Sequence, residues 1–205
     1  MNPEISPIEN LKPTQNSRGA FKSVIREIFI FALIAFGVVL PFRIYIAEPY
    51  IVDGASMDPT FATGNYLIID KISYKLSGLD RNSVVVFKYP NDPSKNFIKR
   101  IIGLPGDIIT VKDNVTRIVN SNSPKGFNLD QSYVAHECQS SSGKCISSFQ
   151  KILGPDEYFV MGDNRVESFD SRSWGPVPAN NILGKPILRL WPLDKIGVLP
   201  GQDSG

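Results

Sequence analysis

A long uncharged run near the N-terminus restricts the fold of this 205-residue chain more than any other feature. It covers Ile28–Phe42 and is bounded by Arg26-Glu27 and Arg43. The run is shorter than the ~20 residues that usually cross a bilayer, but apolar residues extend it on both sides and the flanking arginines can reach lipid headgroups. We therefore predict a single membrane-spanning helix over residues 24–46, preceded by a tail over residues 1–23.

A cleaved secretory signal peptide is the alternative for this run. Arg43 interrupts the approach to Ala47 and no Ala-x-Ala pattern follows, which favours an uncleaved signal anchor. Only Arg43 follows the run before Lys71, whereas four basic residues precede it: Lys12, Arg18, Lys22 and Arg26. By the positive-inside rule, the tail is then cytoplasmic and the body lies on the other side of the membrane.

The rest of the chain has the composition of a loop-rich β domain, with sixteen glycines and sixteen prolines. Short stretches of β-branched and aromatic residues alternate with Gly, Pro, Asn or Asp, which is typical of strands joined by turns. We expect strands at Tyr50–Val52, Tyr66–Ile69, Val84–Lys88, Phe97–Ile102, Ile108–Val111, Tyr158–Met161 and Ile182–Trp191. The sequence leaves open whether Asp70–Leu79 is a short helix or a loop.

The composition becomes polar after residue 111, with many Ser, Asn, Lys and Gln residues. We predict a β core over residues 47–107 and 155–205, interrupted by a small inserted extension over residues 108–154. Cys138 and Cys145 lie in this extension, and we expect them to form a disulfide in an oxidising compartment. A metal site of these cysteines with His136 and Glu137 is the alternative, but the spacing lacks CxxC and no metal is predicted.

The net charge of +2 indicates no basic face, so nucleic acid is not an expected partner. No cofactor is expected, since Gly103–Asp107 lacks the spacing of a phosphate-binding loop. Ser141–Lys144 fits an S-x-x-K pattern, but it lies in a Ser-rich loop without helix signals. We therefore do not expect that segment to be catalytic.

Three segments carry residues that suit peptide-bond chemistry: Gly54–Thr60, Lys99–Asp107 and Gly162–Arg172. Ser56 follows a predicted strand, and such a junction can present a hydroxyl beside backbone N–H groups. A serine in a turn is by itself ordinary. The only histidine of the chain lies in the polar extension, which makes a Ser-His-Asp triad improbable.

Lys99 is then the candidate general base. On a strand it shares a face with Phe97 and Ile101, and an apolar setting would lower its pKa, as a base requires. A lysine on an exposed strand edge is the plain alternative. Arg100 should point to the opposite face.

In order and spacing, the three segments resemble those of bacterial type I signal peptidases, also called leader peptidases. These are membrane-anchored serine endopeptidases that remove signal peptides from exported preproteins with a Ser/Lys dyad. The resemblance implies a mainly β fold, in which a single N-terminal transmembrane helix precedes an antiparallel β-sheet catalytic core with a small inserted β extension. It implies Ser56 as nucleophile, Lys99 as general base, and cleavage after Ala-x-Ala. The implied partners are preproteins and membrane lipid.

The resemblance assigns supporting roles to further residues. Gly54 stands where well-known Gram-negative members have a serine that donates to the oxyanion, so the Ser56 N–H must supply more of that role. Ser168 matches the serine that orients the catalytic lysine. The remaining matches are two ion pairs, Asp170 with Arg172 and Asp163 with Arg100, and the apolar positions of the substrate pockets, Tyr50, Val52, Met57, Phe61, Phe97 and Ile98.

Two other functions remain open. A self-cleaving Ser/Lys protease of the SOS-repressor type shares the dyad, but a membrane anchor here replaces the DNA-binding domain. A non-catalytic, membrane-tethered β domain acting as a binding module is the second. It predicts that Ser56→Ala leaves function intact.

Overall fold

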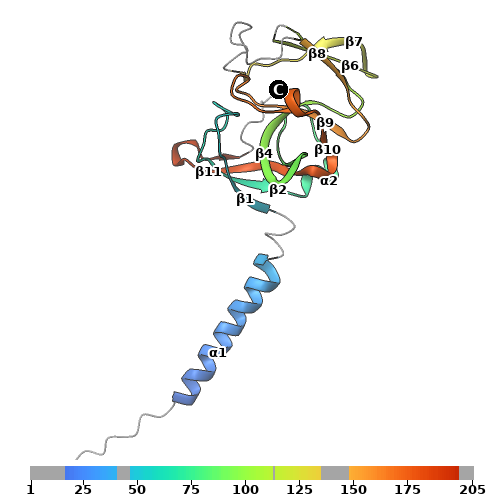
Figure 1. The fold of residues 1–205 in the computed structure, drawn as a ribbon. Coiled ribbons are helices and arrows are strands. Elements are labelled where there is room, and N and C mark those ends of the chain that lie inside the picture. The colour runs from blue at the N-terminus through green and yellow to red at the C-terminus, as the bar shows by residue number, and fades with distance from the viewer. Residues whose placement is uncertain (1–16, 41–46, 113, 135–147, 199–205) are drawn as a thin grey trace, which may run out of the picture. The chain divides into compact units, whose positions relative to one another are not determined.

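The computed structural model of the chain describes residues 17–40, 47–112, 114–134 and 148–198 (Figure 1). The chain divides into two compact units, Met1–Phe42 and Arg43–Gly205. Cys138, Cys145 and His136 lie outside the described residues, as does Ser141–Lys144. The predicted disulfide therefore stays a prediction.

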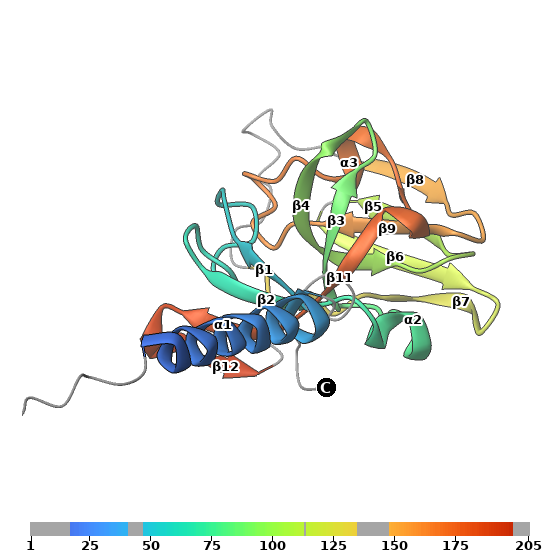
Figure 2. The same cartoon turned by 90° about the horizontal axis from the view of Figure 1, so that it is seen from below.

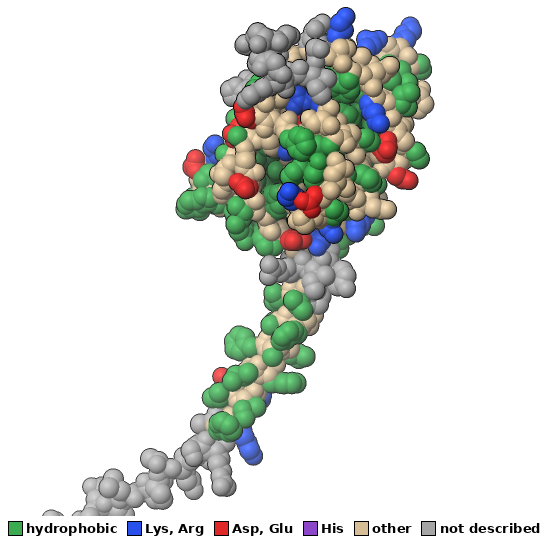
Figure 3. All heavy atoms as spheres, in the orientation of Figure 1, with side chains coloured by type: hydrophobic (Ala, Val, Ile, Leu, Met, Phe, Trp, Pro, Cys, Tyr) green, Lys and Arg blue, Asp and Glu red, His purple; other side chains and the backbone are tan. Residues whose placement is uncertain are grey.

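The first unit contains one helix, α1 (Ser17–Ile34), which continues directly into the π-helical turn η1 (Ala35–Val39). The helix begins within the residues predicted as a tail. Figure 3 shows apolar side chains along it, and many of these are exposed: Phe21, Val24, Ile25, Ile28, Phe29, Phe31 and Leu33. Across the described residues, we find no helix that is both long and apolar enough for a membrane crossing. The transmembrane helix expected over residues 24–46 is thus not confirmed.

The second unit is mainly β, as the sequence predicts, and its described strands pair antiparallel. An eight-stranded sheet has the order β1-β2-β11-β3-β4-β9-β10, with β12 paired to β11. Its strands are β1 (Ala47–Ile51), β2 (Tyr66–Asp70), β3 (Val84–Tyr89), β4 (Asp92–Gly103), β9 (Glu157–Met161), β10 (Val177–Pro178), β11 (Ile182–Trp191) and β12 (Gly197–Val198).

A second sheet of four strands is formed within the segment predicted as an extension. Its order is β7-β6-β5-β8, with β5 (Ile108–Lys112), β6 (Val115–Asn120), β7 (Ser123–Asn128) and β8 (Ser148–Ile152). Ile109 and Ile118 on its inner face pack in one cluster with Ile102 of β4 and Phe159 of β9. The strands of the two sheets can be followed in Figure 2. The second sheet therefore shares a core with the first.

Short helical segments complete the unit: α2 (Ser73–Ser77), α3 (Ser171–Trp174) and the 3-10 turns η4 (Ala179–Asn181) and η5 (Leu193–Lys195). The segment that the sequence left open is thus a short helix. Asp70 Oδ1 accepts hydrogen bonds from the N–H groups of Ile72 (2.8 Å) and Ser73 (3.1 Å) where α2 begins. The Tyr74 hydroxyl donates to Ile182 O at 2.8 Å, which ties α2 to β11.

Strand β4 lies between β3 and β9, and its residues from Ile98 to Gly103 are all buried. Ile98 packs in one apolar cluster with Met57 and Phe61, whereas Ile101 packs in another with Val85 and Val160. Because both faces of the strand are covered, the two consecutive cations of β4, Lys99 and Arg100, both lie in the interior. Their surroundings define the candidate site.

Candidate active site

Ser56 lies in a loop that leaves β1 and returns to β2. The loop is closed at its base, where Val52 N donates to Asn65 O at 3.0 Å and Gly64 N donates to Val52 O at 2.9 Å. Asp58 N donates to Ala55 O at 3.2 Å, so Ser56 occupies a tight turn. Gly54 before and Pro59 after Ser56 are residue types that favour such turns.

Gly54 has a φ of +95°, in the region that side chains disfavour, and its N–H donates to Thr63 Oγ1 at 3.0 Å. A serine at this position would be strained even though space for a Cβ is open. The backbone therefore gives a physical reason for glycine here. Among the described non-glycine residues, only Asn82 and Asn114 have positive φ. Ala55, which directly precedes Ser56, therefore has a backbone conformation that does not require glycine.

Lys99 reaches Ser56 from β4. Its Nζ donates hydrogen bonds to Ser56 Oγ at 2.6 Å and to Ile98 O at 2.9 Å, and it lies 5.5 Å from the centre of the Phe97 ring. The residue is only 4% exposed. The two residues that the sequence proposes as nucleophile and base are thus in direct contact.

The environment of Lys99 favours the neutral amine. Burial lowers the pKa of Lys99 from 10.5 to about 8, although the Asp170 and Asp163 carboxylates raise it and Arg172 lowers it. Desolvation is the largest of these effects, because a buried ammonium loses its hydration. A buried lysine beside a serine hydroxyl is a suitable general base.

Ser168, which the resemblance implies as the residue that orients Lys99, has no hydrogen bond to Lys99 in the described part of the chain. Its Oγ donates to Asp170 Oδ2 at 2.6 Å, whereas the hydrogen bonds of Lys99 within the described chain go to Ser56 and Ile98. The bond to Asp170 uses only the donor of the Ser168 hydroxyl, whose lone pairs can still accept from a lysine. The expected role of Ser168 in orienting Lys99 therefore stays a prediction.

Asp170 holds the third segment together. Arg172 approaches it with Nε at 2.8 Å from Oδ1 and Nη2 at 2.8 Å from Oδ2, so the expected ion pair is present. The N–H of Gly162 donates to Oδ2 at 3.0 Å. Burial raises the pKa of Asp170, but hydrogen bonds from Arg172 and Ser168 outweigh it and hold this pKa below its usual value.

The expected pair of Arg100 and Asp163 is fully buried, with Nε at 2.8 Å from Oδ1 and Nη2 at 2.6 Å from Oδ2. Arg100 Nη1 also donates to Asn82 O at 2.7 Å, and its guanidinium lies 3.9 Å from the Tyr133 ring centre. Thr60 Oγ1, in the Ser56 loop, donates to Asp163 Oδ2 at 2.6 Å. Asp163 thus connects β4 with that loop, on the side away from Lys99.

Five of the six expected pocket residues lie together. Buried Val52, Met57, Phe61 and Ile98 form one apolar cluster, and Tyr50 packs against it with its hydroxyl 3.3 Å from Asn96 O. Phe97 lies elsewhere, because strand alternation turns it to the face of Lys99. There it stacks on Tyr89, with ring centres 4.9 Å apart.

Gly162 stands in the third segment but is not among the predicted site residues. A Cβ added here would lie 2.3 Å from Ser56 O and 2.3 Å from Ser168 Oγ, so glycine lets the two loops touch. Its neighbour Asn164, also not predicted as a site residue, hydrogen-bonds the loop as well: Asn164 N–H donates to Ser56 O at 3.1 Å. The available signal was their place beside Asp163 in the motif.

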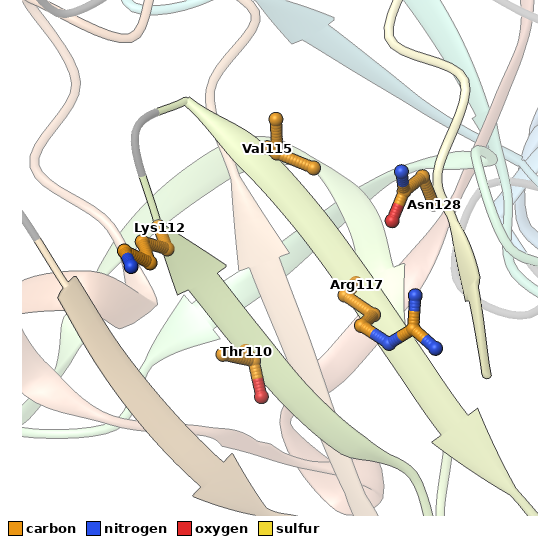
Figure 4. Close-up of a pocket in the computed structure, with 5 residues that line it drawn as sticks. All are labelled: Thr110, Lys112, Val115, Arg117 and Asn128. Carbon is orange, nitrogen blue, oxygen red and sulfur yellow. The ribbon is translucent and has the colours of Figure 1, made fainter. Parts of the chain in front are cut away.

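A separate shallow pocket lies on the outer face of the second sheet (Figure 4). It is lined by Thr110, Lys112, Val115, Arg117 and Asn128, none of which is a predicted site residue. Over the residues that the structure describes, no group of His, Cys, Asp and Glu side chains has the arrangement of a metal site.

A comparison with protein families matches residues 25–191 to signal peptidase, peptidase S26. A probable signal peptidase I-2 of Synechocystis sp. is 38% identical over 163 residues, which is 77% of this chain and 69% of that protein. A signal peptidase I of Leptolyngbya laminosa is 31% identical over 205 residues, covering 96% of this chain and 93% of that protein.

A crystal structure of a signal peptidase I from Enterococcus faecalis V583 is a weak structural match, with a TM-score of 0.43 and 25% identity over 52% of this chain and 95% of that chain. The assignment rests on the family match and the sequence relatives. The class defined by these findings is that of the S26 peptidases. The chain belongs to the signal peptidase family.

Proposed function

We propose that this chain is a serine endopeptidase that removes N-terminal signal peptides from exported preproteins, with Ser56 as nucleophile and Lys99 as general base. The observation that carries the proposal is the 2.6 Å contact between Lys99 Nζ and Ser56 Oγ, in surroundings that lower the pKa of Lys99 to about 8. Family membership supplies the substrate class.

In this mechanism neutral Lys99 takes the proton of Ser56 as Oγ attacks the scissile carbonyl carbon. The carbonyl electron pair moves onto oxygen, where the Ser56 N–H stabilises the charge. The Lys99 ammonium then donates its proton to the leaving amine, and an acyl-enzyme ester remains. A water molecule loses a proton to Lys99, attacks the ester and releases the signal peptide, while the proton returns to Ser56 Oγ.

The surrounding charged residues hold this pair in place. The Asp170–Arg172 pair fixes the loop that contains Ser168, and the Arg100–Asp163 pair anchors Thr60 behind the nucleophile. We assign these residues structural support, because their hydrogen bonds given above go to one another, to Thr60 and Ser168, and to backbone, although both carboxylates also raise the pKa of Lys99. Preorganisation of this kind lowers the barrier by keeping the reacting groups aligned.

We propose cleavage after small residues, with Ala-x-Ala as the favoured pattern. The buried apolar cluster around Met57 and Phe61 includes the residue that follows Ser56, so we expect the adjoining site to accept a methyl group better than a larger side chain. Efficient hydrolysis after Leu or Phe would contradict this assignment.

We further propose that the protein is a single-pass protein of the bacterial inner membrane, with a cytoplasmic N-terminus and the β body outside. The charge-free run after Glu27 and the exposed apolar side chains of α1 and η1 support an anchor at this end. The Lys and Arg residues that precede the run support the orientation. Protease added to intact spheroplasts should digest the body, and full protection would reverse the topology.

The direct test is incubation of purified protein with a preprotein that carries an Ala-x-Ala site, comparing wild type with Ser56→Ala. We expect cleavage at that site by wild type and none by Ser56→Ala. Ser77→Ala is the matched control, since this exposed hydroxyl bonds only within α2 and its flank. Equal activity of Ser56→Ala and wild type would refute the proposal. Loss of the enzyme's own full-length band, with the preprotein left intact, would indicate a self-cleaving protease instead.

A further inference from the structure

Asn164 holds the carbonyl groups on both sides of Ser56. Its backbone N–H donates to Ser56 O at 3.1 Å, and its side-chain Nδ2 donates to Ala55 O at 3.2 Å. The residue is 7% exposed, and its Oδ1 accepts a hydrogen bond from Glu167 N–H at 3.3 Å. This last contact orients the amide so that its donor end faces Ala55.

These two carbonyls belong to the peptide units that enter and leave Ser56. Within the described chain, cis peptide bonds occur only at Asp58–Pro59 and Trp191–Pro192, so both units are trans. In a planar trans peptide, C=O and N–H point in opposite directions. Holding Ala55 O therefore aims the Ser56 N–H away from Asn164, and holding Ser56 O does the same for the Met57 N–H.

Neither of these N–H groups donates a hydrogen bond within the described part of the chain, whereas their neighbours do. Gly54 N–H donates to Thr63 Oγ1 at 3.0 Å, and Asp58 N–H donates to Ala55 O at 3.2 Å. Two consecutive donors at the nucleophile are thus left available. The chain also lacks a hydroxyl at position 54, where the resemblance to Gram-negative members implies one.

We propose that Asn164 is a positioning residue that aims the N–H groups of Ser56 and Met57 at one oxyanion. This inference rests on the proposed function, because it concerns the tetrahedral intermediate of that reaction. Preorganised N–H donors stabilise such an oxyanion without reorganisation during the reaction. The amide of the residue after the nucleophile has this role in other serine hydrolases. Here it would replace the side-chain donor missing at Gly54.

The surrounding contacts keep this arrangement rigid. Gly162 lies so close to Ser56 O that a Cβ there would approach it to 2.3 Å. Further along the same loop, Thr60 Oγ1 donates to Oδ2 of buried Asp163 at 2.6 Å. These contacts fix the backbone of the Ser56 turn, and with it the N–H groups of Ser56 and Met57.

The test uses two variants, Asn164→Ala and Asn164→Asp. Both keep the backbone donor to Ser56 O and lose the side-chain donor to Ala55 O; the aspartate also keeps an acceptor for Glu167 N–H. Asn181→Asp is the matched control, since Asn181 Nδ2 donates to Lys88 O at 3.0 Å. Rates are compared on the high-pH plateau, where a new charge no longer alters how much Lys99 is neutral.

We expect kcat to fall about 10- to 100-fold in both variants, less than the ~10²–10³-fold loss from deleting an oxyanion donor, while KM changes less than about twofold. A peptide boronate, which forms a tetrahedral adduct with a serine, should bind more weakly by the factor by which kcat/KM falls. A product peptide should bind equally well. Thermal melting followed by circular dichroism establishes that the variants are folded at the assay temperature.

A kcat within twofold of wild type for folded Asn164→Ala would overturn the inference. A lower kcat with unchanged boronate affinity would also overturn it, because the oxyanion contacts would then be intact. If Asn164→Ala is unfolded at the assay temperature, the same comparison with Asn164→Asp decides. Wild-type protein that cleaves no preprotein would refute the proposed function itself, which separates the two failures.

Discussion

The depressed pKa of Lys99 makes a quantitative prediction for the Phe97→Ala variant. With a pKa of about 8, roughly one tenth of Lys99 is neutral at pH 7. At the ordinary value of 10.5, the neutral fraction would be only about 3 in 10,000. The drop of about 2.5 units corresponds to roughly 3 kcal/mol at ~1.36 kcal/mol per unit. The main source is burial, to which the Phe97 ring contributes at 5.5 Å from Nζ.

Removing this ring admits water to the ammonium and should raise the pKa of Lys99 by about one unit. The ring also stabilises the ammonium through its π face, and loss of that attraction would lower the pKa instead. Desolvation is the largest cause of the observed shift, so we expect the upward direction to prevail. The rate at pH 7 should then fall about tenfold, while the plateau at high pH is retained.

The assay is kcat/KM for a peptide with an Ala-x-Ala site, measured from pH 6 to 10.5. Wild type should rise tenfold per unit below about pH 8 and then level off, because the base must be neutral. Phe127→Ala is the matched control, since that ring lies 5.5 Å from the Arg81 guanidinium and away from the site. An apparent pKa of Phe97→Ala at or below that of wild type would refute burial as the cause.

Three further predictions follow from the contacts of the site. Lys99→Met should lose cleavage yet unfold at a higher temperature than wild type at pH 7. Because the pKa of Lys99 is lower in the folded state, its charge destabilises the fold fully below about pH 8, and this penalty disappears above pH 10.5. A lower melting temperature of the variant at pH 7 would contradict this. Asp163→Ala leaves the Arg100 charge buried without its carboxylate and should cost about 3–5 kcal/mol in urea denaturation, and a loss under 1 kcal/mol would be inconsistent with the buried pair. Gly162→Ala should reduce kcat at least tenfold by displacing Ser56, whereas Gly197→Ala, with no atom nearer than 4.0 Å to its added Cβ, should match wild type; equal rates for both would show that the close approach is unimportant.

Much of the fold could be predicted because its strands are locally encoded. Val84–Tyr89 and Ile182–Trp191 are rich in β-branched and other apolar residues, and they form strands at the expected places. The helix at Ser73–Ser77 could not be decided, since Tyr74 is held by a hydrogen bond to distant Ile182. The size of the second sheet could also not be predicted from the sequence, because its core includes Ile102 and Phe159 of other strands.

The candidate site divides in the same way. Lys99 on the face of Phe97 follows from strand alternation, and Ser56 follows from the motif. The partner of Ser168 does not, because a hydroxyl can donate to a carboxylate or accept from a lysine, and only the geometry shows that it donates to Asp170. The role of Asn164 could not be predicted, because it donates to backbone carbonyls and every residue has such a carbonyl whatever its side chain.

The core common to the two sheets limits how the chain can be shortened. Removal of residues 108–154 would expose the faces of Ile102 and Phe159 that now contact Ile109 and Ile118, all four at most 1% exposed. A minimal enzyme therefore cannot be obtained by excising the insert and rejoining the ends. A shortened protein has to retain β5 and β6, which cover that core, or replace them with another apolar surface of the same area.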